Sequence, residues 1–419
     1  MQGLSRIVLL LATSASVAGA APTQVRLSIM GDATTIGIAW TTVRGPVGQE
    51  VRFRAQSEGA AGERTARAHS TRIDGFGTVS EVTLTGLRPD TLYRYRVGSH
   101  AAGWSGPWTF RTAGAASLRV AVVGDSRAER YQGGKGASDT WVHLVSLIAR
   151  RAPALVLHTG DIVHDGRELA QWAGHLTVTE PLSARVPVMY AMGNHDDGPG
   201  EGAAANFNRV LYQPRSDPAV GGSGTEDYAY FTVGPALFVV LSTATFTGAR
   251  DRTRFAQQAA WLDGVLVRHP HHWKLVVLHH PIYTERLRFS HPPNEAGQNA
   301  ALVPVFNRHR VDVVFQGHNH FYERWAPSRC AKGASPTPCP VAPGQRGTIY
   351  ITTGGGGAFP ILVAGGTGGM RRAVSSAHHV VMLELTRRTL RLEAVDAAGD
   401  VIDRLNRTRS SGASAGARM

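Results

Sequence analysis

The chain contains 419 residues, of which 44 are Lys or Arg and 31 are Asp or Glu, so its formal net charge is +13. This length is enough for two or more domains, each with its own hydrophobic core. The basic residues are spread through every segment and form no stripe, so we expect no nucleic-acid-binding face. The positive charge would instead steer small anionic substrates towards the protein.

The first twenty residues have the pattern of a secretory signal peptide. Arg6 provides the positive start, Ile7–Ala12 the apolar stretch, and Ala18-Gly19-Ala20 the small residues of a cleavage site. A membrane anchor is the alternative, but the apolar stretch is far shorter than the ~20 residues that a transmembrane helix needs. No later segment is long and apolar enough to cross a bilayer. We therefore expect a secreted or periplasmic protein with residues 1–20 removed and no membrane span.

Residues 21–114 have the alternating pattern of an all-β domain. Apolar and polar residues alternate around Trp40, Phe53, Leu84 and Tyr95, and turn-rich stretches separate these runs. Leu87-Arg88-Pro89 followed by Tyr93 is typical of the corner at which a Tyr hydroxyl reaches back to upstream backbone in β-sandwiches. This segment resembles a fibronectin type III-like module. It contains no acid/base or metal-binding pattern, so we expect it to pack against or position the following domain.

Residues 115–405 alternate predicted strands with amphipathic helices. The helices are expected at Asp139–Arg150, Arg167–Ser183, Thr253–Val267 and Asn299–Arg308. Tyr228–Val233 and Ala236–Leu241 are predicted to form a hairpin, and Thr348–Thr352, Val380–Leu385 and Leu390–Val395 to complete a second sheet. This order predicts a layered α/β/β/α sandwich. Residues 406–419 are mainly Ser, Gly, Ala and Arg and are expected to be a disordered tail.

The chain has two cysteines, Cys330 and Cys339, in one loop rich in Pro, Gly and Ala. In an exported protein such a pair is typical of a local disulfide that constrains a long loop. Two free thiols are the alternative.

Polar side chains follow directly after five short apolar runs. The runs are Leu118–Val123, Ala154–Leu157, Val186–Met192, Leu275–Leu278 and Val311–Phe315. The groups that follow are Gly124-Asp125, Gly160-Asp161, Gly193-Asn194-His195-Asp196, His279-His280 and Gly317-His318-Asn319-His320. Short apolar runs are typical of buried strands, and ligands bind at the carboxyl ends of such strands in α/β sheets. The sequence therefore predicts that carboxylates, an amide and imidazoles meet in one crevice and bind metal.

The order of these motifs resembles the calcineurin-like metallophosphoesterases, a superfamily with two metal ions. Gly317–Arg324, Val276–Pro281 and the preceding fibronectin-like domain are similar to the purple acid phosphatase branch. The resemblance implies that Asp161 bridges both metals. It assigns Asp125 and His320 to one ion, and Asn194, His279 and His318 to the other.

The physical chemistry agrees with this assignment. Two cations roughly 3.5–4 Å apart repel each other, and a shared anionic oxygen reduces that repulsion. A neutral Asn oxygen and imidazoles limit the negative charge, so the ions stay able to polarise a phosphoryl oxygen. Water bound to such ions becomes hydroxide near neutral pH and can attack phosphorus. Fe, Zn or Mn ions would suit these ligands.

The resemblance also implies roles towards the substrate. His195 is expected to face the substrate and protonate the leaving group, with Asp196 fixing its tautomer; a purely structural His195 is the alternative. His280, beside a ligand, is expected to contact the substrate.

Two positions depart from the purple acid phosphatase pattern. Arg127 replaces the usual Gly and is expected either to reach the substrate phosphate or to form a surface salt bridge. His164 replaces the ligating Tyr; it either substitutes as a ligand or lies off the metal in a turn. Without a Tyr ligand the protein should not be purple.

The sequence thus predicts an exported dinuclear phosphatase of small phosphate monoesters. A phosphodiesterase or nucleotide hydrolase on the same scaffold is the nearest alternative, and a non-catalytic surface or adhesion module is a more distant one. The oligomeric state does not follow from the sequence.

Overall fold

A computed structural model describes residues 21–43, 48–129, 136–196, 205–244, 248–270, 272–330, 335, 337–342, 345–363 and 368–409. The predicted signal peptide lies outside the described residues. None of the described helices is both long and apolar enough to span a bilayer.

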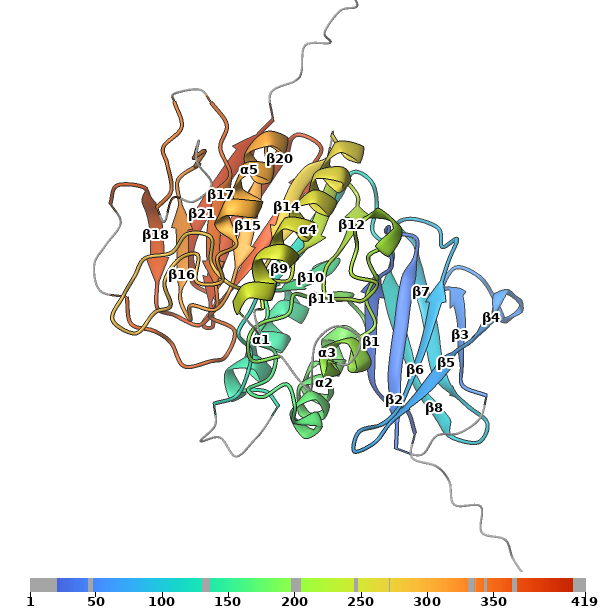
Figure 1. Cartoon of the computed structure of the whole chain (residues 1–419). Helices are drawn as coiled ribbons and strands as arrows, with labels where there is room; N and C mark the ends of the chain where they lie inside the picture. Colours follow the sequence, from blue (N-terminus) through green and yellow to red (C-terminus); the bar gives the residue numbers. More distant parts are fainter. Residues whose placement is uncertain are drawn as a thin grey trace, which may run out of the picture.

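The N-terminal domain is a sandwich of two four-stranded antiparallel sheets, as the alternating pattern predicted (Figure 1). The first sheet has the order β1 (Thr23–Ile29), β2 (Ile36–Thr42), β6 (Gly77–Leu84) and β5 (His69–Ile73). The second has the order β4 (Arg64–Arg67), β3 (Glu50–Ala55), β7 (Leu92–Ser99) and β8 (Gly103–Arg111). The predicted corner is present, because the Arg88 backbone N–H donates to the Tyr93 hydroxyl at 2.9 Å.

The second domain contains two mixed sheets. The six-stranded sheet has the order β11 (Val188–Tyr190), β10 (Leu155–His158), β9 (Ser117–Val123), β19 (His379–Thr386), β20 (Thr389–Asp396) and β21 (Val401–Thr408). The seven-stranded sheet has the order β12 (Ala229–Val233), β13 (Ala236–Val240), β14 (Trp273–Val277), β15 (Val313–Gln316), β17 (Ile349–Thr353), β16 (Tyr322–Trp325) and β18 (Arg371–Ser375). β9–β11 are parallel to one another, as are β13, β14, β15 and β17.

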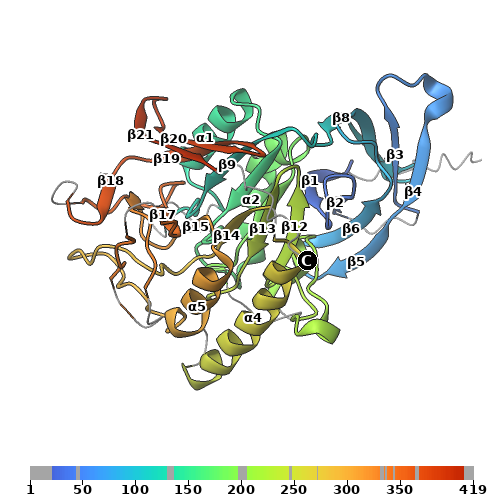
Figure 2. The same cartoon turned by 90° about the horizontal axis from the view of Figure 1, so that it is seen from above.

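Helices cover the outer faces of the two sheets and complete the α/β/β/α layers, which confirms the predicted fold class (Figure 2). The helices α1 (Asp139–Arg150) and α2 (Leu169–Ser183) pack on the six-stranded sheet. The helices α4 (Gly248–Arg268) and α5 (Asn299–His309) pack on the seven-stranded sheet. A short helix, α3 (Asn206–Val210), also contributes to the first of these layers.

The predicted placement of the last strands was wrong in part. β19 and β20 do not join the second sheet, because β19 pairs with β9 in the first one, with Val381 opposite Val122. β19 is apolar on both faces: Val381 and Leu383 lie between the sheets, and Val380 lies under α1 and α2. Such a strand needs a place with cover on both sides.

The predicted tail begins too early. Residues 406–408 belong to β21, where Asn406 pairs with Arg391 and Arg407 with Leu390. The Arg407 guanidinium also donates to the backbone carbonyls of Asp312 and Gly347, which anchors this strand end. Residues 410–419 lie outside the described part of the chain. The predicted disulfide between Cys330 and Cys339 is present.

The two domains share one continuous apolar core, which includes residues of both sandwiches. Polar contacts also cross the boundary: the Tyr95 hydroxyl donates to the Ala184 carbonyl at 2.7 Å, and the Gln24 side chain donates to the Ala173 carbonyl at 3.1 Å. The N-terminal sandwich therefore supports α2 and β11. Asp161 precedes α2 and Asn194 follows β11, so both polar motifs adjoin these supported elements.

Candidate metal centre

The five polar motifs lie at the carboxyl ends of strands from both sheets. Asp125, Asp161 and Asn194 follow β9, β10 and β11, and His279 and His318 follow β14 and β15. Asp125, Asp161 and His318 have φ angles of 58°, 54° and 69°, so the chain turns sharply where each side chain enters the site. A Cβ atom on Gly193 would lie 2.2 Å from the Asp161 Oδ1, so only glycine allows this close approach.

Four potential ligand atoms surround one point of this site. The His279 Nε2 lies 3.0 Å from the Asn194 Oδ1, 3.1 Å from the His318 Nδ1 and 3.2 Å from the Asp161 Oδ1. Asp161, His279 and His318 are each buried. These residues are the predicted second-metal set.

The hydrogen bonds of the two imidazole rings indicate that the nitrogens facing the site, His279 Nε2 and His318 Nδ1, are acceptors. The Asn194 and Asp161 oxygens are acceptors as well. The His279 Nδ1 lies 2.9 Å from the Thr159 carbonyl, which can only accept, so Nδ1 carries the proton and Nε2 has a lone pair. The His318 Nε2 lies 2.8 Å from the Glu295 carboxylate, which leaves a lone pair on Nδ1. Four acceptors without a donor between them repel one another, and a bound cation removes that repulsion. The donor set therefore fits a metal ion.

A second group contains Asp125, Asp161 and His320, whose ligand atoms lie within 4.8 Å of one another. The His320 Nδ1 donates to the Phe359 carbonyl at 2.9 Å, so its Nε2 lone pair faces the Asp125 Oδ1 at 3.7 Å. Asp161 belongs to both groups. It therefore occupies the position that a carboxylate shared by two cations would need.

Burial and charge set the protonation of these ligands. Burial lowers the pKa of His279 to about 3 and that of His320 to about 4, so both imidazoles are neutral over the physiological range. Burial alone would raise the pKa of Asp161, but His279, His195 and Arg127 outweigh it and lower that pKa below its usual range. Burial and the neighbouring Asp161 raise the pKa of Asp125 well above its usual range. A cation would favour the ionised carboxylate.

His195 lies at the edge of this centre. Its backbone N–H donates to the Asp161 Oδ1 at 3.0 Å, and its Nδ1 donates to the His164 carbonyl at 2.7 Å. The ring Nε2 is therefore free to face the site, 4.0 Å from the Asp161 Oδ2. The side chain is 29% exposed, which leaves it accessible to a substrate.

The predicted orientation of His195 by Asp196 was wrong. The Asp196 carboxylate accepts from the backbone N–H groups of Ile162 and Val163 at 2.8 and 3.1 Å, and from that of Gly193 at 2.8 Å. The backbone carbonyl of His164 fixes the His195 tautomer instead. Asp196 thus holds together the loops that carry Asp161 and Asn194, a role that residue spacing cannot reveal.

Arg127 lies within the centre rather than in a surface salt bridge. Its Nε lies 3.6 Å from the Asp161 Oδ2, and its Nη1 donates to the Glu129 carboxylate at 3.1 Å. Only 8% of its side chain is exposed.

The structure does not bring His164 into either ligand group. Its Nδ1 lies 3.2 Å from the Arg127 Nη1, and its ring centroid lies 5.1 Å from that of His195. The Glu168 backbone N–H donates to the Asp165 carbonyl at 3.0 Å, so the segment forms the turn that was the alternative prediction.

His280 lies behind the ligands rather than in the open site. It is 4% exposed, its ring centroid is 4.4 Å from that of His318, and its backbone N–H donates to the Thr243 hydroxyl. This burial does not support the predicted contact with substrate.

Two residues of the centre were missed. The Glu295 carboxylate accepts a hydrogen bond from the His318 Nε2, and the centroids of the His291 and His318 rings lie 3.8 Å apart. Both come from a turn-rich loop before α5, where no strand or motif marked them. The only feature of the sequence that could have indicated these residues is the closeness of Glu295 to His291 along the chain, and such pairs are common.

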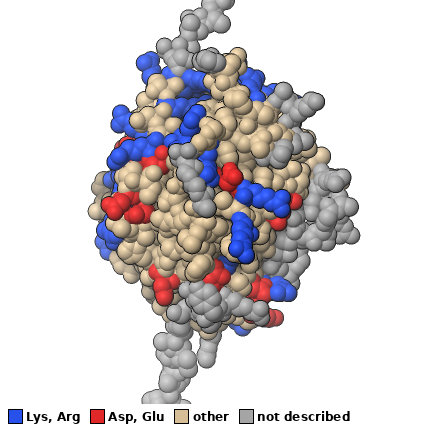
Figure 3. Space-filling model, turned by 90° about the vertical axis from the view of Figure 1, so that its left-hand side faces the viewer, with Lys and Arg blue, Asp and Glu red and all other residues tan. Residues whose placement is uncertain are grey.

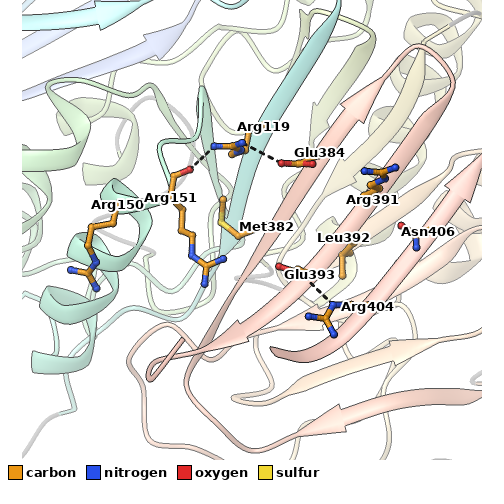
Figure 4. Close-up of a pocket in the computed structure, with 10 residues that line it drawn as sticks. All are labelled: Arg119, Arg150, Arg151, Met382, Glu384, Arg391, Leu392, Glu393, Arg404 and Asn406. Atoms are coloured by element: carbon orange, nitrogen blue, oxygen red, sulfur yellow. Dashed lines mark hydrogen bonds and ion pairs between the residues drawn. The ribbon is translucent and has the colours of Figure 1, made fainter. Parts of the chain in front are cut away.

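A polar hollow of about 600 Å³ opens beside His195. Its lining comes from the loops after β10 and β11 and from the start of α2: His164, Asp165, Arg167, Glu168, Gln171, Asn194 and His195. Another hollow of about 480 Å³ lies on the outer face of β9 and β19–β21, near Arg119 and so at the opposite end of β9 from Asp125 (Figure 4). Of these two hollows, the first lies at the metal centre.

Comparison with known proteins identifies the domains. Residues 118–322 match the family model of calcineurin-like phosphoesterases, and residues 22–112 match that of the purple acid phosphatase N-terminal domain. The chain joins a calcineurin-like metallophosphoesterase domain to a purple acid phosphatase N-terminal domain. Metallophosphoesterases hydrolyse phosphoric esters, and the residues of the two ligand groups all lie in the segment that matches this family.

Relatives extend over most of this metallophosphoesterase. It is 27% identical to mouse acid phosphatase type 7 over 374 residues, which cover 81% of this chain and 79% of the relative. It is 26% identical to purple acid phosphatase 15 of Arabidopsis thaliana over 396 residues, which cover 81% of this chain and 69% of the relative.

Two solved structures share the fold. A purple acid phosphatase from yellow lupin seeds superposes with a TM-score of 0.71 at 18% identity, covering 94% of this chain and 75% of the lupin chain. PhoD superposes with a TM-score of 0.62 at 13% identity, covering 94% of both chains. At these identities the superpositions establish the fold and leave the substrate open.

Proposed function

We propose that this metallophosphoesterase is an exported, dinuclear metal-dependent phosphatase that hydrolyses phosphate monoesters. The observation that carries the proposal is the sharing of Asp161 between two ligand groups built from different strands. A structural metal site would need one closed group, whereas a pair with a common carboxylate is typical of two-metal hydrolases.

Six residues would hold the two ions: Asp125, Asp161 and His320 for one, and Asp161, Asn194, His279 and His318 for the other. When bound, the ions would polarise the phosphoryl oxygens and activate water as the nucleophile. Imidazole, amide and carboxylate ligands suit Fe, Zn or Mn. The absence of a Tyr at His164 argues against the purple colour.

The protein's own side chains would act on the substrate from two sides. The His195 Nε2, with its tautomer held by the His164 carbonyl, would donate a proton to the leaving oxygen. The Arg127 guanidinium, anchored by Glu129, would bind a phosphoryl oxygen. A monoester dianion gains more from this buried cation than a diester monoanion does, which favours monoesters.

Export is supported by two features. The first twenty residues have the signal-peptide pattern, and the Cys330–Cys339 disulfide suits an oxidising compartment. Periplasmic and fully secreted locations share both features.

The test uses the metal-loaded protein and an aryl phosphate. The substitutions Asp161→Ala and Asn194→Ala should each abolish turnover while circular dichroism stays that of the wild type. Asp74→Ala removes a carboxylate whose side chain is fully exposed, and it should keep full activity. Retained activity in both centre variants would refute the proposal.

A phosphodiesterase is the second candidate, since the polar hollow beside His195 has room for a second ester group. Relative rates on an aryl monoester and a bis-aryl diester separate the two functions. A non-catalytic role is the more distant alternative, and one relative is indeed named a probable inactive purple acid phosphatase. The intact ligand groups argue against it.

A further inference from the structure

Four arginines of the N-terminal domain face one another on the outer surface of its second sheet. β3 and β7 are antiparallel neighbours, and their register places Arg52 opposite Arg96 and Arg54 opposite Arg94. The alternate residues Phe53 and Tyr95 point into the core and are buried, so the arginines all project from the other face.

Like charges directly opposite each other across two strands destabilise a sheet. Acidic neighbours compensate only part of this repulsion: Arg52 pairs with Glu50 at 2.7 Å, and Arg96 lies 3.5 Å from Glu63. Arg54 donates to the Glu58 backbone carbonyl, which carries no full charge. Among the described residues, Arg94 has no ion-pair partner.

The indole of Trp104 helps to hold this arrangement. The guanidinium carbons of Arg52 and Arg96 lie 4.6 and 4.8 Å from the Trp104 ring centroid. These contacts restrict two of the four side chains and so reduce the entropy that binding would cost. The Arg96 Nε is also buried without a hydrogen-bond acceptor among the described residues.

The four arginines line a hollow of about 460 Å³, which is within the usual size of a small-molecule site. The other lining residues are Ala60, Glu63, Tyr95 and Pro107, so four guanidinium groups face one carboxylate. Along each strand the two arginines are about 7 Å apart, and across the strands about 5 Å. A ligand with two or more adjacent oxyanion groups could engage several of them at once.

The hollow of about 480 Å³ on the catalytic domain is also lined by arginines, but there they alternate with acidic residues. There the register alternates charge, with Glu384 between Arg119 and Arg391, and Glu393 opposite Arg404 (Figure 4). Basic and acidic side chains are likewise interspersed on the molecular face shown in Figure 3. The arginines on β3 and β7, in contrast, face one another without an acidic residue between them.

We propose that Arg52, Arg54, Arg94 and Arg96 form a second anion site, separate from the metal centre, for small molecules with linked phosphoryl groups. The planar guanidinium binds phosphoryl oxygens in pairs, which a Lys cluster could not do as well. The volume of the hollow matches a short oligophosphate better than a long polymer. This site does not depend on the proposed phosphatase activity.

The test measures binding of tripolyphosphate to chelator-treated full-length protein by calorimetry at constant ionic strength. Arg54→Thr and Arg94→Thr should each raise the Kd at least tenfold. Arg391→Thr, in the charge-alternated hollow, is the matched control and should leave the Kd unchanged. Sulfate at equal ionic strength should bind far more weakly, because it offers one oxyanion group instead of three.

Thermal unfolding without ligand provides the second measurement. Arg94→Thr removes repulsion and should raise the melting temperature, whereas Arg94→Lys retains the charge and should leave it unchanged while still weakening binding. Equal loss of binding in Arg94→Thr and Arg391→Thr would overturn the proposal. So would the absence of saturable binding at millimolar tripolyphosphate, or binding of a single-stranded polynucleotide without competition by tripolyphosphate.

Discussion

The His279 Nε2 and the His318 Nδ1 face each other at 3.1 Å, and the group on the far side of each ring is an acceptor. The Thr159 carbonyl and the Glu295 carboxylate fix the two tautomers from behind. Two lone pairs at this distance repel, and the Asp161 and Asn194 oxygens beside them add to the repulsion. A cation bound between these four atoms would remove that repulsion.

Removal of metal should therefore destabilise the protein. At a metal concentration about 1,000 times the Kd, binding stabilises the native state by about 4 kcal/mol. Thermal unfolding of the metal-loaded and chelator-treated protein measures this difference. His279→Ala should lose most of it, and Asp74→Ala should keep it. The same melting temperature with and without metal would show that no ion occupies the cluster.

His195 and Asp196 should fail in different ways when substituted. His195→Gln removes the proton donor and should lower kcat about 10²–10⁴-fold with metal content unchanged. Asp196→Asn replaces one of the two carboxylate oxygens that accept from three backbone N–H groups with an NH2 donor, so it should loosen the Asp161 and Asn194 loops and weaken metal affinity about 10–100-fold. Metal analysis alongside kinetics separates these outcomes. Loss of metal in His195→Gln would contradict the assigned role.

His164 should position Arg127 and contribute no metal ligand. His164→Ala is expected to retain two metal ions per chain and to raise KM several-fold, because the Arg127 Nη1 loses a hydrogen-bond acceptor. Arg127→Lys should raise KM in the same direction. If His164→Ala binds a single ion, the ring must turn towards the metal in the loaded protein and the original ligand prediction is correct.

The Arg324–Asp403 ion pair should be a major stabilising contact between the two sheets. The Arg324 guanidinium makes two hydrogen bonds to the Asp403 carboxylate, at 2.6 and 2.9 Å, and the Tyr322 hydroxyl donates a third. Asp403→Asn should lower the free energy of unfolding by about 2–4 kcal/mol, because it leaves a largely buried guanidinium uncompensated. Arg404→Ala, which breaks an exposed pair on the same strand, should cost less than about 1 kcal/mol.

Stability should fall in acid partly because of His175. Burial lowers its pKa to about 3 from an ordinary value of 6.5. Below pH 6.5 His175 is protonated in the unfolded chain but stays neutral in the folded chain. The free energy of unfolding therefore falls as the pH drops from 6.5 towards the pKa of His175 in the folded state. Between pH 6.5 and 4.5 the wild type should lose up to about 2 kcal/mol more than His175→Gln does. Urea unfolding of both proteins at the two pH values checks this, and parallel pH profiles would contradict it.

Patterns local in the sequence predicted most of the fold. The helix at Asp139–Arg150 agrees with α1 at both ends, and the hairpin around Gly234 is present. The membership of β19 and β20 in the first sheet was not predictable, because the alternation along an apolar strand does not tell which of two sheets it joins. Strand pairing of this kind depends on contacts between residues far apart in the chain.

The candidate site shows the same limit. The meeting of five site residues was predicted from the strand ends, because the backbone brings the carboxyl ends of parallel strands to one edge of each sheet. These residues are Asp125, Asp161, Asn194, His279 and His318. The contacts of the other residues of the site depend on the directions of their side chains. Asp196 points to backbone N–H groups, His280 lies behind His318, and Glu295 enters from a loop. Spacing along the chain carries no information on these directions.

The most direct test of the dinuclear centre is anomalous X-ray diffraction from crystals of the metal-loaded protein. Two anomalous peaks roughly 3.5–4 Å apart are expected, with the Asp161 carboxylate between them. The His279 and His318 nitrogens should lie next to one peak, and the Asp125 oxygen and the His320 nitrogen next to the other. A single peak, or two peaks of which only one contacts Asp161, would contradict the account.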